Sequence, residues 1–283
     1  MGKAIIGKTI TYADGTWHDD SPKTLRPNNH AFWLSSVVFD GARSIKGKTP
    51  DLLPHSERVI RSAKIMGLAP DITGKEIAAI ALDGVKRFPP DAELYISPMF
   101  YGEEGFILPD PASTKFIMSI FEAAIPEPTG FSACKTRFRR PAKDMAPTEA
   151  KASCLYPNVA RGVREATDKG FDVGIVMDPN GNVAEFSYTN LFMVKNGIVH
   201  TPAINGTFLN GITRQRIIQL LTDDGMTVEQ RPIDFEELLT ADELFATGNF
   251  AKVQPCIRIE HQELQPGPIF RKARELYFSF AAE

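Results

Sequence analysis

The sequence predicts an α+β protein with two domains. Runs of strand-forming residues separated by turn dipeptides occur together with amphipathic helical segments, which is typical of this class. A proline-punctuated stretch breaks the periodicity near the middle of the chain, and we place a linker there, at residues 124–135. The N-terminal domain then comprises residues 1–123 and the C-terminal domain residues 136–283. A chain of 283 residues is long enough for two modest hydrophobic cores.

The first domain is expected to start with an edge hairpin around the turn Asp14-Gly15. An apolar run follows at residues 31–39. Pro54 at the start and Gly67 at the end then mark an amphipathic helix. The remaining expected elements of this half are a helix through residues 75–82 and strands at 93–100 and 114–121.

The second domain is expected to contain a meander of three strands, at residues 173–177, 185–194 and 198–200. The turns between them are Asp178-Pro179-Asn180-Gly181 and Asn196-Gly197, and Asn-Gly is a strong hairpin signal. Helices are expected at residues 158–169, 213–224 and 269–281.

Composition excludes several classes of function. Hydrophobic residues make up 43% and charged residues 24%, as in ordinary soluble globular proteins. The net charge of −3 gives no reason to expect nucleic acid or an anionic membrane surface as a partner. Residues 1–8 lack the apolar core of a signal peptide, and apolar runs such as 116–121 are too short to cross a bilayer.

Cysteine and histidine usage indicates a reducing compartment and no metal. The three cysteines, Cys134, Cys154 and Cys256, are widely spaced and odd in number, so a disulfide framework is not expected. We therefore predict a cytoplasmic protein. The five histidines show no spacing typical of metal ligands, and no metal site is expected.

The strongest chemical signal is Lys151 among small residues, followed by Tyr156 and, in an apolar strand, Glu185. Together they supply what pyridoxal phosphate requires: an amine for an imine, a phenol for the ring oxygen and an anion for the pyridine nitrogen. On these residues alone, a surface lysine and an ordinary strand glutamate are the favoured interpretation, because both residue types are common.

Further motifs change this balance. From about residue 28 to the C-terminus the chain resembles the class IV aminotransferases, in particular the branched-chain aminotransferase-like enzymes of PLP fold type IV (D-amino acid/branched-chain aminotransferase-like). The motifs that carry the resemblance are FDGAR at residues 39–43, HSERVIRSAK at 55–64, YISP at 95–98, EAK at 149–151, Glu185 with TNLF at 189–192, and GITR at 211–214.

The resemblance implies a role for each cofactor residue. Lys151 would be the catalytic residue, bound covalently to the cofactor and shuttling a proton. Tyr156 would bond the ring oxygen, and Glu185 would keep the pyridine nitrogen protonated. The phosphate would be held by Arg58 and by backbone donors of two segments. These segments contribute Ile212, Thr213, Gly248 and Asn249, the last where relatives often have threonine.

Two positions depart from the branched-chain pattern. Ser97 replaces an arginine two places beyond the tyrosine matched by Tyr95, and Leu34 replaces a tyrosine five places before Phe39. Both changes remove polar contacts that shape the usual substrate pocket, which puts L-valine, L-leucine and L-isoleucine as substrates in doubt.

Replacement groups for the substrate are available in the sequence. The candidates for a carboxylate clamp are Arg43, Arg137, Arg139 and Arg140, although residues 137–140 are equally well explained as a solvated basic loop. The candidates for an apolar pocket are Phe32, Trp33, Phe39 and Phe250.

The expected activity is transfer of an amino group from a small-molecule donor to a 2-oxo acid acceptor. The alternatives are a D-amino acid or (R)-amine transaminase, an aminodeoxychorismate lyase, and a catalytically silent relative. Intact Lys151, Glu185 and Arg58 argue against the last of these. The resemblance also implies a homodimer in which a loop of the neighbouring subunit partly closes a site at the domain cleft.

Overall fold

The computed structural model describes residues 7–283, which divide into two compact units. The N-terminal unit comprises residues 7–125, 149–155 and 281–283, and the C-terminal unit comprises 126–148 and 156–280. This differs from the expected boundaries in two respects: the segment assigned to a linker already enters strand β7 at Phe131, and residues 149–155 return to the N-terminal unit. We expected no signal peptide in residues 1–8, and residues 1–6 of that stretch lie outside the described residues.

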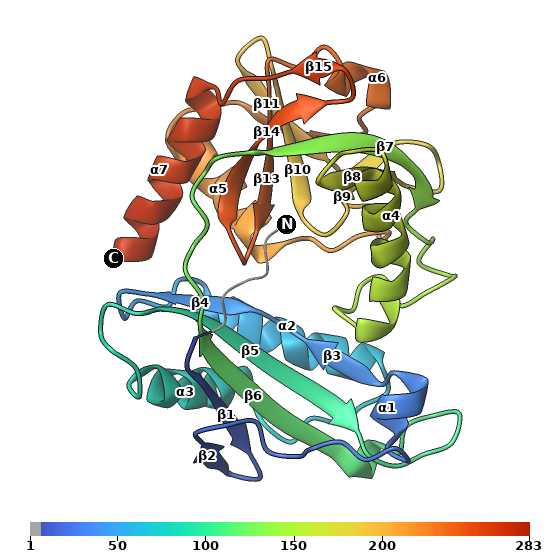
Figure 1. The fold of residues 1–283 in the computed structure, drawn as a ribbon, viewed down its shortest axis with the longest axis vertical. Helices are drawn as coiled ribbons and strands as arrows, with labels where there is room; N and C mark the ends of the chain where they lie inside the picture. Colours follow the sequence, from blue (N-terminus) through green and yellow to red (C-terminus); the bar gives the residue numbers. More distant parts are fainter. Residues whose placement is uncertain (1–6) are drawn as a thin grey trace. The chain divides into compact units, whose positions relative to one another are not determined.

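The N-terminal unit is built on an antiparallel six-stranded sheet (Figure 1). The strand order is β2-β1-β6-β5-β3, and β4 also pairs with β5. Asp14 and Gly15 both have positive φ, 49° and 79°, which confirms the predicted hairpin turn. The strands are β1 (Thr9–Ala13), β2 (Thr16–His18), β3 (Val37–Phe39), β4 (Ala42–Ile45), β5 (Glu93–Gly102) and β6 (Thr114–Glu122).

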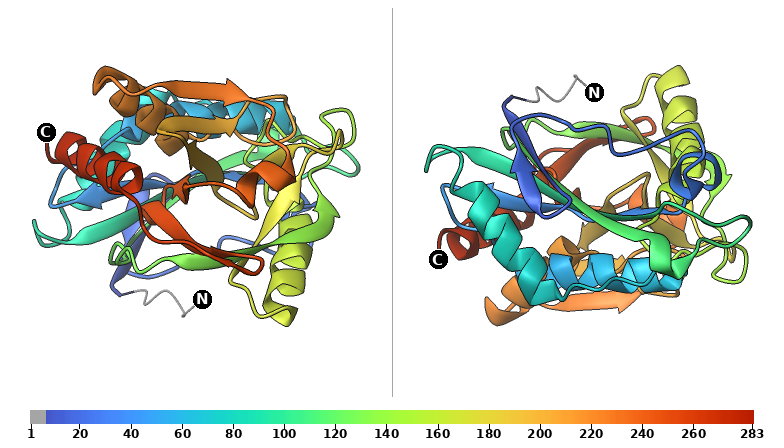
Figure 2. Two further views of the ribbon diagram at one scale, coloured as in Figure 1. Left: turned by 90° about the horizontal axis from the view of Figure 1, so that it is seen from above. Right: turned by 90° about the horizontal axis from the view of Figure 1, so that it is seen from below.

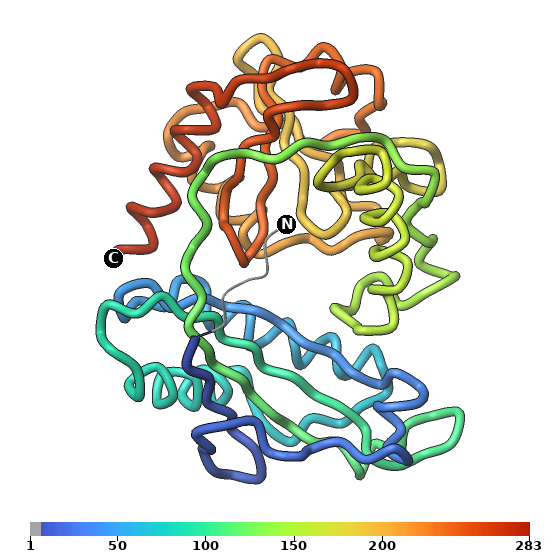
Figure 3. Tube along the Cα trace, in the orientation of Figure 1, coloured from blue at the N-terminus to red at the C-terminus, as the bar shows by residue number. Residues whose placement is uncertain are grey.

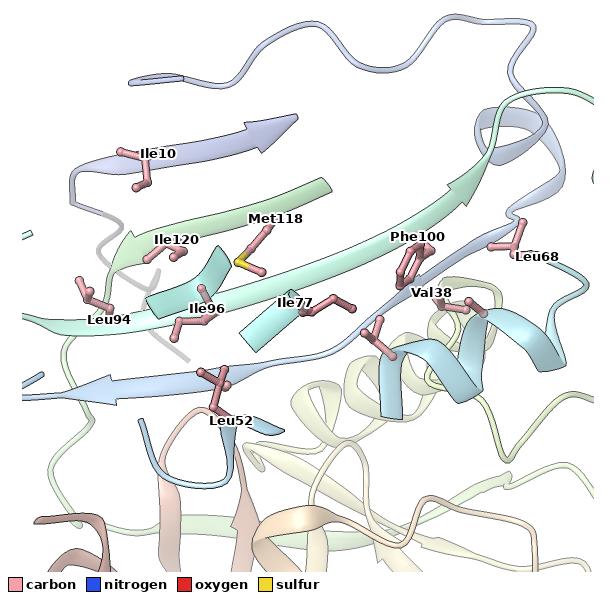
Figure 4. Packing of buried hydrophobic residues seen from close by; sticks show 14 of the residues in the cluster. Ile10, Val38, Leu52, Leu68, Ile77, Leu94, Ile96, Phe100, Met118 and Ile120 are labelled. Carbon is pink, nitrogen blue, oxygen red and sulfur yellow. The ribbon is translucent and has the colours of Figure 1, made fainter. Parts of the chain in front are cut away.

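Helices α2 (Leu52–Ile65) and α3 (Gly74–Val85) cover one face of this sheet (Figure 2). A capping box between Thr73 and Glu76 starts α3. Buried apolar side chains from both layers form the core, as Figure 4 shows for Ile77 of α3 and strand residues such as Ile96. The expected apolar run at 31–39 is divided into a short helix, α1 (His30–Leu34), and β3, because Ser35 is left-handed with φ 59°.

The C-terminal unit contains a sheet of nine strands in the order β12-β11-β10-β13-β14-β7-β8-β9, with β15 beside β14. Both predicted turns of the meander are confirmed, with positive φ at Gly181, Asn196 and Gly197. The strand expected at 185–194 is two strands, β9 and β10. The strands are β7 (Phe131–Arg139), β8 (Val173–Met177), β9 (Val183–Phe186), β10 (Asn190–Lys195), β11 (Ile198–Pro202), β12 (Val228–Arg231), β13 (Glu243–Gly248), β14 (Lys252–Ile259) and β15 (Gln262–Glu263).

The three helices expected in the second half begin within two residues of their expected positions, and a short helix that was not expected lies at Phe235–Leu238. Figure 3 traces the chain from the first of them, α4, into β8. Within residues 7–283, no helix is both long enough and apolar enough to cross a membrane. The helices are α4 (Tyr156–Asp168), α5 (Ile212–Asp223), α6 (Phe235–Leu238) and α7 (Pro268–Ala282), with short turns η1 (Pro111–Ser113) and η2 (Ser153–Leu155) elsewhere in the chain.

A buried carboxylate joins α2 to the chain that follows β3. Asp40 is fully buried, and its oxygens accept hydrogen bonds from Arg58 Nε and Nη2 at 2.7 and 2.8 Å. His55 Nδ1 lies 2.7 Å from Asp40 Oδ1. Burial by itself would raise the pKa of Asp40, but the charges and hydrogen bonds of Arg58 and His55 hold this pKa well below its usual range.

We expect Asp40→Asn to lower the free energy of unfolding by about 3 kcal/mol at pH 7, because it leaves the largely buried Arg58 without its counter-charge. The unfolded carboxyl titrates near pH ~3.9. Since the folded pKa is lower, this stabilisation is complete above the unfolded pKa and is lost as the pH falls through the folded pKa. Wild type and variant should therefore converge in acid.

Denaturant unfolding at pH 7 and in acid measures both parts of this expectation. Glu103→Gln is a matched control, because it removes only the exposed pair between Glu103 and Lys115, worth at most about 1 kcal/mol. The expectation would be contradicted if Asp40→Asn lowered the free energy of unfolding at pH 7 by no more than Glu103→Gln does.

Candidate active site

Lys151 is fixed through its backbone within the N-terminal unit. Its N–H donates to Ser62 Oγ of α2 at 3.0 Å, and its carbonyl accepts from Phe39 N at 3.1 Å. The neighbouring Ala150 and Ala152 are fully buried in the core of this unit. The Nζ atom lies 4.5 Å from the ring centroid of Phe39. The structure thus brings the candidate amine and one candidate pocket residue together.

The other candidates of the N-terminal unit have partners of their own. Arg43 is fully buried, and its guanidinium donates to the carbonyls of Ala123 and Ala124 at 2.6 and 3.3 Å. Tyr95 faces Arg43 across β4 and β5 and stacks on Phe121. Ser97 Oγ donates to the carbonyl of Asp40 at 3.4 Å.

Glu185 in β9 is a buried carboxylate with a close cation. It is 5% exposed, and Arg140 Nη2 lies 2.6 Å from its Oε1 atom. The same guanidinium donates to the carbonyl of Ser187 at 3.0 Å, which sets its direction. Asn190 Nδ2 lies 3.4 Å from Glu185 Oε2. Arg140 thus places a positive charge against the carboxylate of Glu185 inside the C-terminal unit.

Asn190 connects Glu185 to the start of α5. Its Nδ2 atom also donates to the carbonyl of Leu209 at 3.0 Å. Gly211, the N-cap of α5, allows this close approach, because a Cβ atom there would lie 2.0 Å from Asn190 Oδ1. Ile212 and Thr213 are the first helical residues and are buried. The first backbone N–H groups of a helix have no partner within the helix and attract anions.

The turn between β13 and β14 lies beside the same elements. Asn190 pairs with Thr247 across β10 and β13, and a Cβ atom at Gly248 would lie 2.9 Å from Thr189 Cγ2. Thr247 Oγ1 and Asn249 Nδ2 are buried and have no hydrogen-bond partner within the described part of the chain. The structure therefore brings together five candidates of the C-terminal unit: Glu185, Ile212, Thr213, Gly248 and Asn249.

The remaining candidates are more exposed. Tyr156 begins α4 and is 37% exposed, and Phe250 follows Asn249 at 40%. Leu34 ends α1 at 38%. Arg139 is exposed and donates to the carbonyl of Pro179 at 3.1 Å, while Arg137 pairs with Glu165 at 3.7 Å.

These groups fit the cofactor that the sequence analysis predicted. Buried donors at Thr247 and Asn249, next to a glycine and a helix N-terminus, suit a phosphate. Glu185 is the anion that a protonated pyridine nitrogen requires, and Lys151 supplies the amine. The donor set carries no thiol or imidazole cluster, and residues 7–283 contain no group of three side chains suited to a metal ion.

Three contributors were not identified from the sequence. Arg140 was considered only as a substrate clamp, whereas its closest partner is Glu185. Asn190 lies in the TNLF motif and Asp40 in the FDGAR motif, but the sequence indicated neither the contact of Asn190 with Glu185 nor that of Asp40 with Arg58. A polar residue in an otherwise apolar strand, as at Asn190, was the available signal.

The comparisons with known proteins agree with this geometry. A family model described as amino-transferase class IV matches residues 37–259. The chain is 44% identical to an aminotransferase from Brucella abortus with a crystal structure bound to the co-factor PLP, with a TM-score of 0.96 over 98% of this chain and 100% of that one. This match confirms the predicted fold class.

Two further relatives carry a more specific name. A branched-chain aminotransferase from Thermoproteus uzoniensis, solved with norvaline, is 30% identical with a TM-score of 0.88 over 98% of this chain and 96% of that one. A probable branched-chain-amino-acid aminotransferase from Rickettsia bellii is 33% identical, covering 82% of this chain and 80% of the relative. With a family model spanning most of its length and relatives of this similarity, the chain belongs to the class IV aminotransferases.

Proposed function

We propose that this protein is a pyridoxal 5'-phosphate-dependent aminotransferase that moves an amino group between an amino acid or amine and a 2-oxo acid. The observation that carries the proposal is the buried Arg140–Glu185 pair. Asn190 connects this pair to the start of α5, where backbone N–H groups can donate to a phosphate. The PLP-bound relative from Brucella abortus supports the same cofactor.

When bound, pyridoxal phosphate supplies an electron sink for the electron pair released at the α-carbon of the substrate. Lys151 Nζ would bind the cofactor, and as a free amine it would take a proton from that carbon and return it one position away. Because its backbone is held at both the N–H and the carbonyl, Nζ moves only through rotation of its own side chain. Phe39 would keep water away from it.

The other residues hold charge in place. Glu185, which lies against Arg140, would accept a hydrogen bond from the ring nitrogen and so retain a proton there. We propose that Tyr156 donates to the ring oxygen. Arg58, itself positioned by Asp40, would meet the phosphate together with the backbone N–H groups of Ile212, Thr213 and Gly248 and the amide of Asn249.

The substrate is proposed from the two departures and from the contacts of the arginines. Ser97 offers a hydroxyl that already bonds the carbonyl of Asp40, and Leu34 offers no polar group. Arg43 is fully buried and donates to two backbone carbonyls, whereas Arg139 is exposed and donates to one, so Arg139 is the better candidate for the substrate carboxylate. Phe39 and Phe250 would line an apolar side-chain pocket, which discriminates weakly.

A half-reaction screen tests this function. The purified protein is mixed with each enantiomer of a panel of amino acids and primary amines. The decrease in the visible absorbance of the bound cofactor is then followed. We expect amino transfer to a 2-oxo acid, with some other amine donor used better than L-leucine; a D-amino acid or an (R)-amine is the alternative that the screen includes. A preference for L-leucine over all of these would make Ser97 and Leu34 neutral changes, and pyruvate release without amino transfer would identify a lyase.

Glu185→Gln should bind the cofactor but lose about a hundredfold or more in turnover, since an amide cannot hold a proton on the ring nitrogen. Arg140→Met should lose activity as well. Arg140→Lys should keep part of the activity, because it retains the positive charge but not the planar guanidinium that donates to two acceptors. Glu263→Gln, on an exposed strand of the same unit, is the control. Near-normal turnover in Glu185→Gln would show that this carboxylate faces elsewhere.

We also propose that the protein is a homodimer. In the loop after β5, Phe106, Ile107 and Leu108 are each more than 70% exposed, and the ring of Trp33 lies 6.2 Å from that of Phe106. Adjacent exposed apolar groups of this kind favour cover by a second copy. Light scattering that shows an active particle near 31.3 kDa would remove this proposal.

We place the enzyme in the cytoplasm. Cys134, Cys154 and Cys256 are all free, and Cys134 and Cys256 are buried. Burial raises the pKa of Cys134 to about 11 and that of Cys256 to about 12, so both thiols are unreactive at neutral pH. Three cysteines without a disulfide between them suit a reducing compartment, and cell fractionation tests this assignment.

A further inference from the structure

A buried lysine stands next to the candidate phosphate cradle. Lys252 is the first residue of β14, is 1% exposed and has a left-handed backbone with φ 62°. Its Nζ atom donates to Asn249 Oδ1 at 2.7 Å and lies 5.3 Å from the ring centroid of Tyr277. Lysine is rarely buried to this extent without a specific contact. The amino group of Lys252 therefore lies against the turn that carries Gly248 and Asn249.

This contact determines which way the amide of Asn249 faces. A lysine ammonium only donates hydrogen bonds, so the atom that meets it must be the amide oxygen. The Nδ2 atom is then left as a donor, and it is buried without a hydrogen-bond partner in residues 7–283. Thr247 Oγ1, on a side chain that is 1% exposed, is in the same condition.

Buried donors without acceptors cost about 1–3 kcal/mol each, so two of them at one turn point to an acceptor supplied by a ligand. Gly248 lies between them in the chain, without a side chain to fill the space. A phosphate oxygen accepts several hydrogen bonds at once and carries the charge that a nearby ammonium stabilises.

We propose that Lys252 is a positioning residue for the cofactor phosphate: it holds Asn249 by its amide oxygen so that Nδ2 donates to the phosphate. The inference rests on the proposed function, because it takes the anion to be the phosphate of pyridoxal phosphate. It also explains why Asn249 is accompanied by Lys252. A hydroxyl at this position would rotate freely and need no partner to orient it, whereas an amide does.

Titration of the apoprotein with pyridoxal phosphate and with pyridoxal, which lacks the phosphate, tests the proposal. Asn249→Asp keeps an acceptor for Lys252 but removes the donor and adds a negative charge. We expect its dissociation constant for pyridoxal phosphate to rise about tenfold or more, with that for pyridoxal changed by less than about twofold. Asn249→Thr, which restores a rotating donor, should stay within about threefold of wild type for both compounds.

Lys252→Met tests the coupling between the two residues. In the wild-type background we expect about a tenfold loss in affinity for pyridoxal phosphate, and in the Asn249→Thr background less than about threefold. The difference separates orientation of Asn249 from general loss of packing, which would be equal in both backgrounds. If Lys252→Met does not fold, Asn249→Asp decides, since it keeps the contact with Lys252.

Unchanged affinity of Asn249→Asp for pyridoxal phosphate, or equal losses for pyridoxal phosphate and pyridoxal, would overturn the inference. A wild-type protein that binds neither compound would instead remove the proposed function, and this inference with it. The two failures are therefore distinguishable from the wild-type titration alone.

Discussion

The backbone hydrogen bonds of Lys151 are the constraint on which the proposed chemistry depends. The chain returns to the N-terminal unit for residues 149–155, and there Ser62 and Phe39 hold the N–H and the carbonyl of Lys151. The alanines on either side are fully buried, so the segment is anchored in a core on both sides of the lysine. An amine that must reach two neighbouring atoms in turn needs a fixed backbone and a mobile end.

Paired burial of charge is the second principle of the structure. Asp40 is matched by Arg58 and His55, and Glu185 by Arg140. A buried pair is weak evidence for stability, since desolvation offsets much of the attraction. These pairs instead fix the orientation of side chains. Asp40 orients Arg58 in the N-terminal unit, and Arg140 orients Glu185 in the C-terminal unit. In the same way, we propose that Lys252 orients the neutral amide of Asn249.

Much of the fold could be predicted from local signals, and the reasons are visible in particular residues. Asp14-Gly15 and Asn196-Gly197 determine hairpins because both positions must adopt positive φ, which these residues tolerate. Lys151 and Glu185 were found because their spacing matches a family pattern. The return of residues 149–155 was not predictable, because it depends on pairing with β3, more than a hundred positions earlier in the chain. The partners of Arg140 and Lys252 could not be predicted either, because contacts between side chains of different segments produce no periodic pattern in the sequence.

The central claim is that Lys151 is the residue that binds the cofactor. The direct measurement is reduction of the pyridoxal phosphate-loaded protein with borohydride, followed by proteolysis and mass spectrometry of the labelled peptide. We expect to find the reduced cofactor on Lys151 and no label on the Lys151→Ala variant. Label on a different lysine, such as the buried Lys252 beside Asn249, would contradict it.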